Sequence, residues 1–169
     1  MRRLAFVCLV LLLAAPIAAA AAFPSGSDGT LEVERGKGMV KLRITGSIIG
    51  TLVKGQISAY DPDESDGSGP ILKNCSHRQD LSDQTLDPND VKILCSGSNL
   101  RFRLVGGFYS ITIKGYGINI SAVGHGRVWL DGSGDDTGLP DGVYSFNDGP
   151  FQSLPDGGKW FPLAAPSGG

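Results

Sequence analysis

Residues 99–131 read NLRFRLVGGFYSITIKGYGINISAVGHGRVWLD and carry most of the information about the fold. Apolar and polar side chains alternate along this stretch, which is typical of β-strands with one buried face. Glycine-containing positions at 106–107, 115–116 and 124–126 interrupt the alternation, and glycine is favoured in hairpin turns. With turns at these positions, the apolar side chains of four successive strands all fall on one side. The stretch therefore predicts a four-stranded meander whose apolar face carries Phe102, Ile111, Ile120 and Leu130.

The alternation continues toward the N-terminus. Residues 31–44 alternate around a glycine-rich turn at 35–38, which predicts a hairpin with Val33 opposite Val40, and residues 47–60 form a longer extended run. The 25 glycines among 169 residues disfavour long helices, and no long segment has helical apolar spacing. The predicted fold class is all-β: an antiparallel two-layer sandwich or jelly roll of about nine strands built from hairpins, with a partly open β-barrel as the alternative.

The first 22 residues differ in character from the rest of the chain. A short basic start is followed by an uncharged, mostly apolar stretch that ends in a run of alanines, as in a secretory signal peptide. We therefore expect a signal peptide over residues 1–22, a single β-domain over 23–150 and a Pro/Gly-rich C-terminal segment over 151–169. The expected location is secreted or periplasmic, in the cell envelope, with no transmembrane segment after signal cleavage.

Two cysteines remain after the predicted signal peptide, Cys75 and Cys95. In an oxidising compartment two cysteines most simply pair with each other. We therefore expect a Cys75–Cys95 disulfide that pins a polar surface loop over residues 62–90. The loop is rich in Asp, Ser and Pro, which favour turns and irregular structure.

Positive charge is concentrated in one part of the chain, because residues 99–130 contain four basic residues and no acidic one. In the predicted meander all four point away from the apolar face, together with a tryptophan. Arginine beside an exposed tryptophan suits an anionic polymer or a glycan, although an ordinary solvated face, with the tryptophan packed under neighbouring loops, has the same pattern. No nucleic-acid-binding motif accompanies these residues. The candidate ligand-binding residues are Arg101, Arg103, Lys114, Arg127 and Trp129.

The acidic residues give few signs of catalysis or metal binding. Asp61, Asp63 and Asp66 lie close together in a glycine-containing loop and are candidate Ca²⁺ ligands, but their spacing departs from that of an EF-hand. No other metal site or cofactor is expected, and we expect no catalytic residues, since the chain has no G-x-S-x-G motif and no phosphate-binding loop.

Residues 44–57, ITGSIIGTLVKGQI, resemble the Gly/Ile rungs of bactofilin cytoskeletal proteins, and the glycine-punctuated pattern is similar to the jelly rolls of lipopolysaccharide-transport proteins. Neither resemblance carries a site residue, and neither assigns the chain to a family. The sequence predicts a secreted, non-catalytic β-domain of the bacterial envelope or extracellular space, with a binding or structural role through a basic sheet face. The alternative is a small extracellular hydrolase that uses loop carboxylates.

Overall fold

The computed structural model describes residues 27–62, 67, 69–81, 91–134 and 141–166. These residues are all-β, as predicted, and seven strands form one antiparallel sheet. Two strands are very long: β1 covers Gly29–Asp61 and β4 covers Val91–Gly132. The others are short: β2 (Ile71–Lys73), β3 (His77–Asp80), β5 (Val143–Phe146), β6 (Gln152–Ser153) and β7 (Lys159–Leu163).

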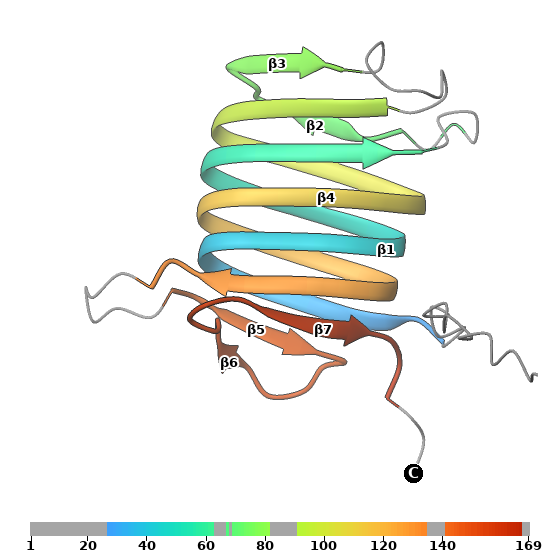
Figure 1. Cartoon of the computed structure of the whole chain (residues 1–169), viewed down its shortest axis with the longest axis vertical. Coiled ribbons are helices and arrows are strands. Elements are labelled where there is room, and N and C mark those ends of the chain that lie inside the picture. Colours follow the sequence, from blue (N-terminus) through green and yellow to red (C-terminus); the bar gives the residue numbers. More distant parts are fainter. Residues whose placement is uncertain (1–26, 63–66, 68, 82–90, 135–140, 167–169) are drawn as a thin grey trace, which may run out of the picture.

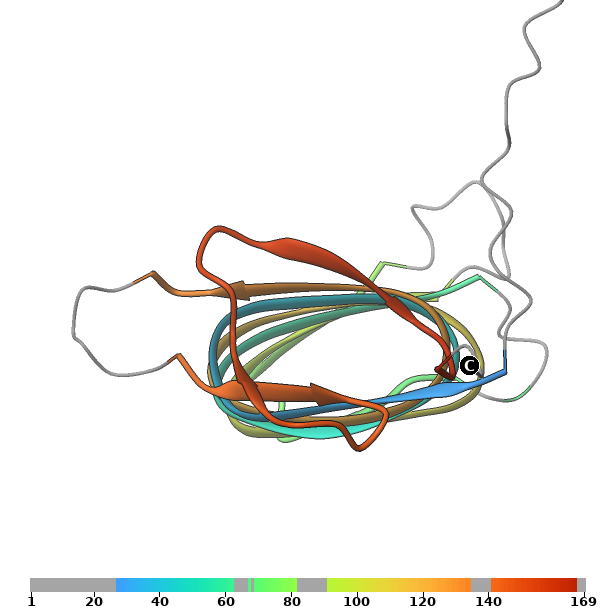
Figure 2. The ribbon, with the colours of Figure 1, turned by 90° about the horizontal axis from the view of Figure 1, so that it is seen from below.

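Strands β1 and β4 run antiparallel and wind together into a coil (Figure 1). Over much of the coil a residue of one strand pairs with two residues of the other, so that Val40 lies between Ile113 and Leu130. In the same way Ile113 pairs with both Val40 and Ile57, which are 17 positions apart. Segments of β1 and β4 alternate along the coil, and neighbouring segments lie about 4.8 Å apart. Each full turn therefore advances a strand by two such spacings, or about 10 Å. Viewed end-on, the coil is flattened into two layers (Figure 2), so the predicted two-layer architecture is formed by one wound pair of strands.

The predicted hairpins within residues 99–131 are wrong, and so is the predicted hairpin at residues 31–44. Leu104 pairs with Ile48 and Tyr109 pairs with Ile44, whereas a hairpin turn at 106–107 would have placed Leu104 opposite Tyr109. The described strands are seven, two of them very long, where about nine short ones were expected. The physical reason is that alternation fixes which side chains face inward but not which strand lies alongside. A glycine pair that can close a hairpin can also let a strand bend at a corner and continue.

Glycines line up in columns at the two edges of the flattened coil. Gly55 pairs with both Gly97 and Gly115, and Gly46 pairs with both Gly107 and Gly124. At Gly55 the backbone φ is +153°, and a Cβ atom there would overlap the carbonyl oxygen of Lys114 on the next strand. Only glycine permits such a close approach of two backbones at this φ. The corner glycines therefore let the two strands turn together without losing their pairing.

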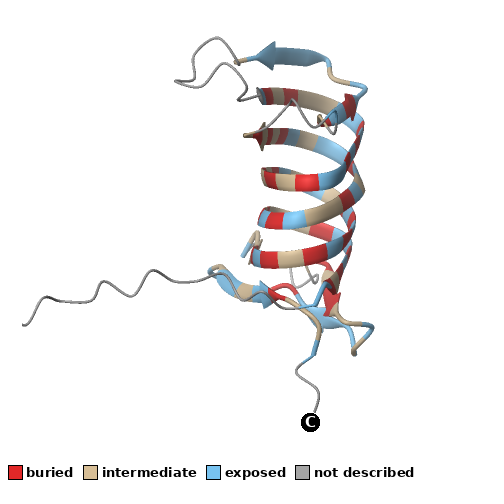
Figure 3. Cartoon of the chain, turned by 90° about the vertical axis from the view of Figure 1, so that its right-hand side faces the viewer, coloured by how far each residue is buried: buried red, intermediate tan, exposed pale blue. Residues whose placement is uncertain are grey.

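The hydrophobic core fills the space between the two layers. Buried and exposed residues alternate along the coil (Figure 3), as expected for strands with one inward face. The sequence predicted which side chains point into the core, and this prediction is confirmed. The four residues that defined the predicted apolar face are at most 4% exposed. They are Phe102, Ile111, Ile120 and Leu130. The core runs without interruption along the coil and includes Leu31, Val40, Leu52, Ile57 and Leu100.

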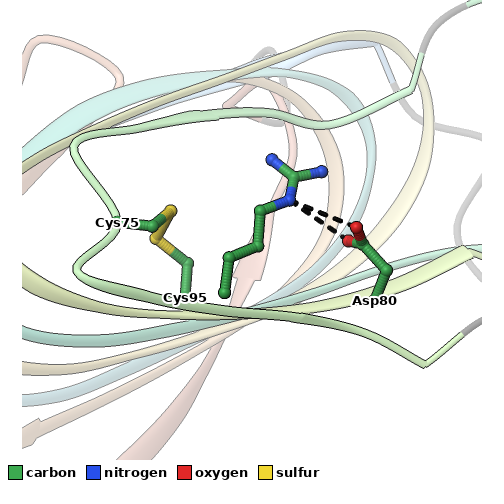
Figure 4. Close-up of polar contacts among 4 residues, drawn as sticks. Cys75, Asp80 and Cys95 are labelled. Atoms are coloured by element: carbon green, nitrogen blue, oxygen red, sulfur yellow. Dashed lines mark hydrogen bonds and ion pairs between the residues drawn. A yellow bond between two sulfur atoms is a disulfide. The ribbon is translucent and has the colours of Figure 1, made fainter.

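The predicted disulfide is confirmed, and it lies at the end of the coil formed by β2, β3 and the start of β4. Cys75, in the turn between β2 and β3, is bonded to Cys95 of β4 (Figure 4), with Cα atoms 5.3 Å apart. Both β2 and β3 lie within residues 62–90, where the sequence predicted only a loop, and both pair with β4. The outer strand β3 is entirely exposed and polar, and Arg78 there forms an ion pair with Asp80. Polar side chains on an edge strand oppose pairing with another chain.

The opposite end of the coil is covered by β5, β6 and β7. Strand β5 pairs with the start of β1, and β7 pairs with the end of β4. The aromatic rings of Tyr144, Phe146 and Phe161 lie 5.3 to 5.6 Å apart and pack against the core. Segment 151–169 thus contributes β6 and β7 to the same sheet.

Candidate functional site

The five predicted ligand-binding residues do not share one surface, because each glycine corner carries β4 from one layer to the other. Arg101 pairs with Thr51 and Lys73, and Arg103 pairs with Ile49 and Ile71. The remaining three residues lie in the other layer. Lys114 pairs there with residues 39 and 56, Arg127 with residues 43 and 162, and Trp129 with residues 41 and 160. A flat meander would have kept all five on one face, so the error follows directly from the hairpin assumption. Ligand binding by these residues stays a prediction.

One layer presents a surface that we call the cationic face. It is defined by the outward side chains of Lys41, Arg43, Lys92, Lys114 and Arg127, all at least partly exposed. Within the described part of the chain, none of these five side chains forms an ion pair. One carboxylate, that of Asp131 on β4, also points outward on this face, where it lies opposite Met39 of β1.

Arg43 and Arg127 lie directly opposite each other on neighbouring strand segments of this face. Like charges in that position repel and destabilise the pairing. On the far side of Arg43 the next residue in line is Ser110, and on the far side of Arg127 it is Pro162, so no carboxylate in this line offsets the repulsion. The face therefore concentrates positive charge at a cost to stability.

Trp129 is part of this surface but is largely covered. Its ring packs edge-on against Trp160 of β7, with ring centroids 5.5 Å apart, and the Lys41 ammonium lies 5.9 Å from its centroid. Its indole Nε1 is buried and has no hydrogen-bond partner among the described residues. The neighbouring Trp160 ring is 46% exposed. The accessible aromatic surface is therefore that of Trp160, with Trp129 beneath it.

Sequence reasoning missed Lys41, Arg43, Lys92 and Trp160. The alternation of residues 40–44 did show that Lys41 and Arg43 point outward. Their position beside Arg127 depends on the pairing of β1 with the end of β4, and that pairing has no signal in the local sequence of either strand.

The other layer presents a shallow groove of about 580 Å³. We call this surface the groove face. The side chains that line the groove alternate with buried ones on β1 and β4. They are Glu32, Glu34, Ile49, Thr51, Arg101, Arg103, Asn119 and Ser121. The two glutamates lie on one side of the groove and the two arginines on the other, and all eight residues are exposed.

The candidate Ca²⁺ ligands are only partly described. Asp61, the last residue of β1, is buried, whereas Asp63 and Asp66 lie outside the described residues. Among the residues that the structure does describe, no three potential metal ligands of the His, Cys, Asp and Glu types come together. Calcium binding therefore stays a prediction.

One carboxylate is held by hydrogen bonds where β4 ends. Asp141 accepts a hydrogen bond from the Ser133 hydroxyl at 2.6 Å and one from the Gly134 N–H at 2.9 Å. Burial opposes its ionisation, but these hydrogen bonds, a further one from the Ser133 backbone and the positive charge of Lys37 outweigh burial and lower the pKa of Asp141. The backbone carbonyl of Asp141 also accepts a hydrogen bond from the Lys37 N–H. Asp141 thus ties the end of β4 to β1 and has a structural role.

No family model, no curated protein and no solved structure matches this chain. Within the described residues there is no helix with the length and hydrophobicity that crossing a membrane requires.

Proposed function

We propose that the protein is a secreted, non-catalytic domain that binds an acidic polysaccharide on its cationic face. The observation that carries this proposal is the Arg43–Arg127 pair, two like charges directly opposed without a carboxylate in their line across the strands. A polyanion laid across the face would supply the missing negative charge and turn a repulsive pair into a binding site.

The arrangement of the cations suits an extended ligand better than a small one. Arg127, Arg43 and Lys92 stand in one line across the strands, with Ser110 and Tyr60 between the last two. The line covers four strand spacings, or about 19 Å. A polymer with an acidic group on each of several residues matches a row of charges of that length.

The aromatic ring beside the cations favours a sugar polymer. Trp160 presents a half-exposed side chain next to Trp129, which lies between it and Lys41, and the apolar face of a pyranose ring packs well on indole. The predicted signal peptide and the disulfide both favour an oxidising compartment, in which extracellular and envelope polysaccharides occur. We therefore propose a carboxylated or sulfated polysaccharide as the ligand.

The test is affinity chromatography and titration calorimetry of dilute purified protein with heparin and with polygalacturonate. The double variant Arg43→Glu, Arg127→Glu should bind at least about tenfold more weakly than the parent protein, equivalent to about 1.4 kcal/mol. The matched control is Arg101→Glu, Arg103→Glu, which makes the same change in net charge on the opposite layer and should bind like the parent. Binding of the parent should weaken as salt is raised.

A third variant separates polysaccharide from other polyanions. Trp160→Ala should weaken binding to both polysaccharides and leave the charge of the face unchanged. Equal loss of affinity in both double variants, or equally tight binding of single-stranded DNA by the parent protein, would overturn the proposal. Absence of binding to both polysaccharides at low salt would do so as well.

A further inference from the structure

The groove face carries opposite charges at its two ends. Along the sheet, successive strand segments present Glu32 and Glu34, then Asn119 and Ser121, then Ile49 and Thr51, and finally Arg101 and Arg103. The acidic and basic ends are thus separated by two uncharged strand segments. Beyond the basic end, β2 adds Ile71 and Lys73.

Glu32 at the acidic end and Arg103 at the basic end stand in register. Glu32 pairs with Ser121, Ser121 with Ile49, and Ile49 with Arg103, so these four side chains form one line across the strands. Glu32 and Arg103 are therefore three strand spacings apart, or about 14 Å, which is too far for an ion pair within the chain. Among the described residues, no ion pair is made by either glutamate or by either arginine.

We propose that two copies of the chain pack groove face to groove face as a twofold-symmetric dimer. The rotation axis would lie in the interface, parallel to the strands, between segments 49–51 and 119–121. A half-turn about this axis exchanges the two ends of the face while keeping each residue in its line. It brings Glu32 against Arg103 of the second copy. Glu34, which lies in the β-bulge between Val33 and Gly36, then comes near Arg101 of the second copy, and symmetry doubles both pairs.

Charge complementarity selects a second copy as the occupant, because the face supplies both partners of every ion pair. The apolar content of the face agrees with this choice. Ile49, next to the axis, is 51% exposed and would lose contact with water in the dimer. The shallow groove leaves room for the long arginine and glutamate side chains to lie between the two sheets. Their pairing there, partly shielded from water, would be stronger than on an open surface.

The contact is small by the standard of stable complexes. It spans four strand segments of a narrow sheet, whereas stable interfaces bury roughly 800 Å² on each partner. We therefore expect weak, salt-sensitive association that depends on protein concentration. This inference does not rest on the proposed polysaccharide binding, which uses the opposite layer and a different measurement.

The test is sedimentation velocity of the purified protein at low salt, from about 10 µM to about 1 mM. The parent protein should shift from monomer to dimer with rising concentration, and added salt should reverse the shift. Variant Glu32→Arg, Glu34→Arg has a groove face with two basic ends, and variant Arg101→Glu, Arg103→Glu has one with two acidic ends. Each variant alone should stay monomeric because like charges would meet in its dimer.

Mixing the two variants is the decisive measurement. In the mixed pair each basic end meets an acidic end, so an equimolar mixture should form a heterodimer at concentrations where each variant alone is monomeric. Loss of folding cannot imitate this result, and circular dichroism of each variant provides a separate check. A monomeric parent protein at every concentration, a monomeric mixture of folded variants, or dimerisation of each variant alone as in the parent would overturn the proposal.

Discussion

Arg43 of β1 and Arg127 of β4 face each other across adjacent strand segments, and the structure places no acidic side chain beside them in their line. Their repulsion should lower stability. We expect Arg43→Thr to raise the free energy of unfolding by about 0.5 kcal/mol, because it removes the repulsion from an exposed strand position. Urea denaturation measures the change.

The control for this substitution is Arg103→Thr, which introduces the same side chain opposite two uncharged neighbours, Ile49 and Ile71. The difference between the two variants isolates the repulsion between arginines and should shrink as salt is added. Equal effects of both substitutions at low salt would mean that β-propensity alone is responsible.

The corner glycines should be among the positions least tolerant of substitution. Gly115→Ala should cost at least about 2 kcal/mol, because φ is +153° and the new methyl group would overlap the carbonyl oxygen of Lys54. Gly69→Ala is the matched control, since no atom lies within 4 Å of a Cβ built there. Thermal unfolding of both variants measures the effect, and similar losses in the two would contradict the role assigned to the corner.

The disulfide should stabilise the end of the coil that carries β2 and β3. Cys75→Ser, Cys95→Ser should lower the free energy of unfolding by about 3 kcal/mol, because the bond closes a 20-residue separation in the unfolded chain. Equilibrium unfolding of the parent protein with and without reductant gives an independent value. A reductant effect of the same size in the double variant would show that another group is responsible.

Asp141 should make stability depend on pH in the acidic range. Its pKa lies below the ordinary value of 3.8, so the ionised form favours folding, and the contribution is fully present above about pH 5. It is lost as pH falls through the lowered pKa, when the carboxylate is protonated in the folded protein too. Asp141→Asn should therefore be less stable than the parent near neutral pH, with the difference shrinking toward pH 2.

Urea titrations at several pH values test this dependence on Asp141. Asp148→Asn, at an exposed position, is the control for the removal of one carboxylate. A difference between Asp141→Asn and the parent that stays constant from pH 2 to pH 6 would rule out the linkage.

The inward face of the coil could be predicted from the sequence, but the pairing of strands could not. Phe102 and Ile111 are buried as the alternation indicates, because the side-chain period of two is a local property of a strand. Their neighbours are set by which distant segment lies alongside: Phe102 pairs with Gly50 and Ile111 with Leu42. The sequence did contain one signal of the winding, because glycine recurs at intervals of 17 positions. Examples are Gly38 and Gly55 in β1 and Gly115 and Gly132 in β4.

The candidate site was predictable only in part, for the same reason. Arg101 and Arg127 point outward as expected, but three glycine corners separate them, and this odd number places them on different layers. Trp160 lay in a segment with little periodicity, so nothing in the sequence indicated that β7 would bring it onto Trp129. The cationic face is assembled from four regions of the chain, and such assembly becomes visible only once the winding is known.

The glycine columns also restrict how this molecule can grow or shrink. At the inner corners, such as those of Gly46 and Gly55, a glycine lies on both neighbouring strand segments. Lengthening one long strand alone would therefore shift its later corners out of register with the other strand. Adding one full turn of the coil to both strands would keep the corner glycines paired and would lengthen the coil by one turn. Length in this architecture therefore changes in paired increments, and single-strand insertions should be tolerated only in the connections outside the winding.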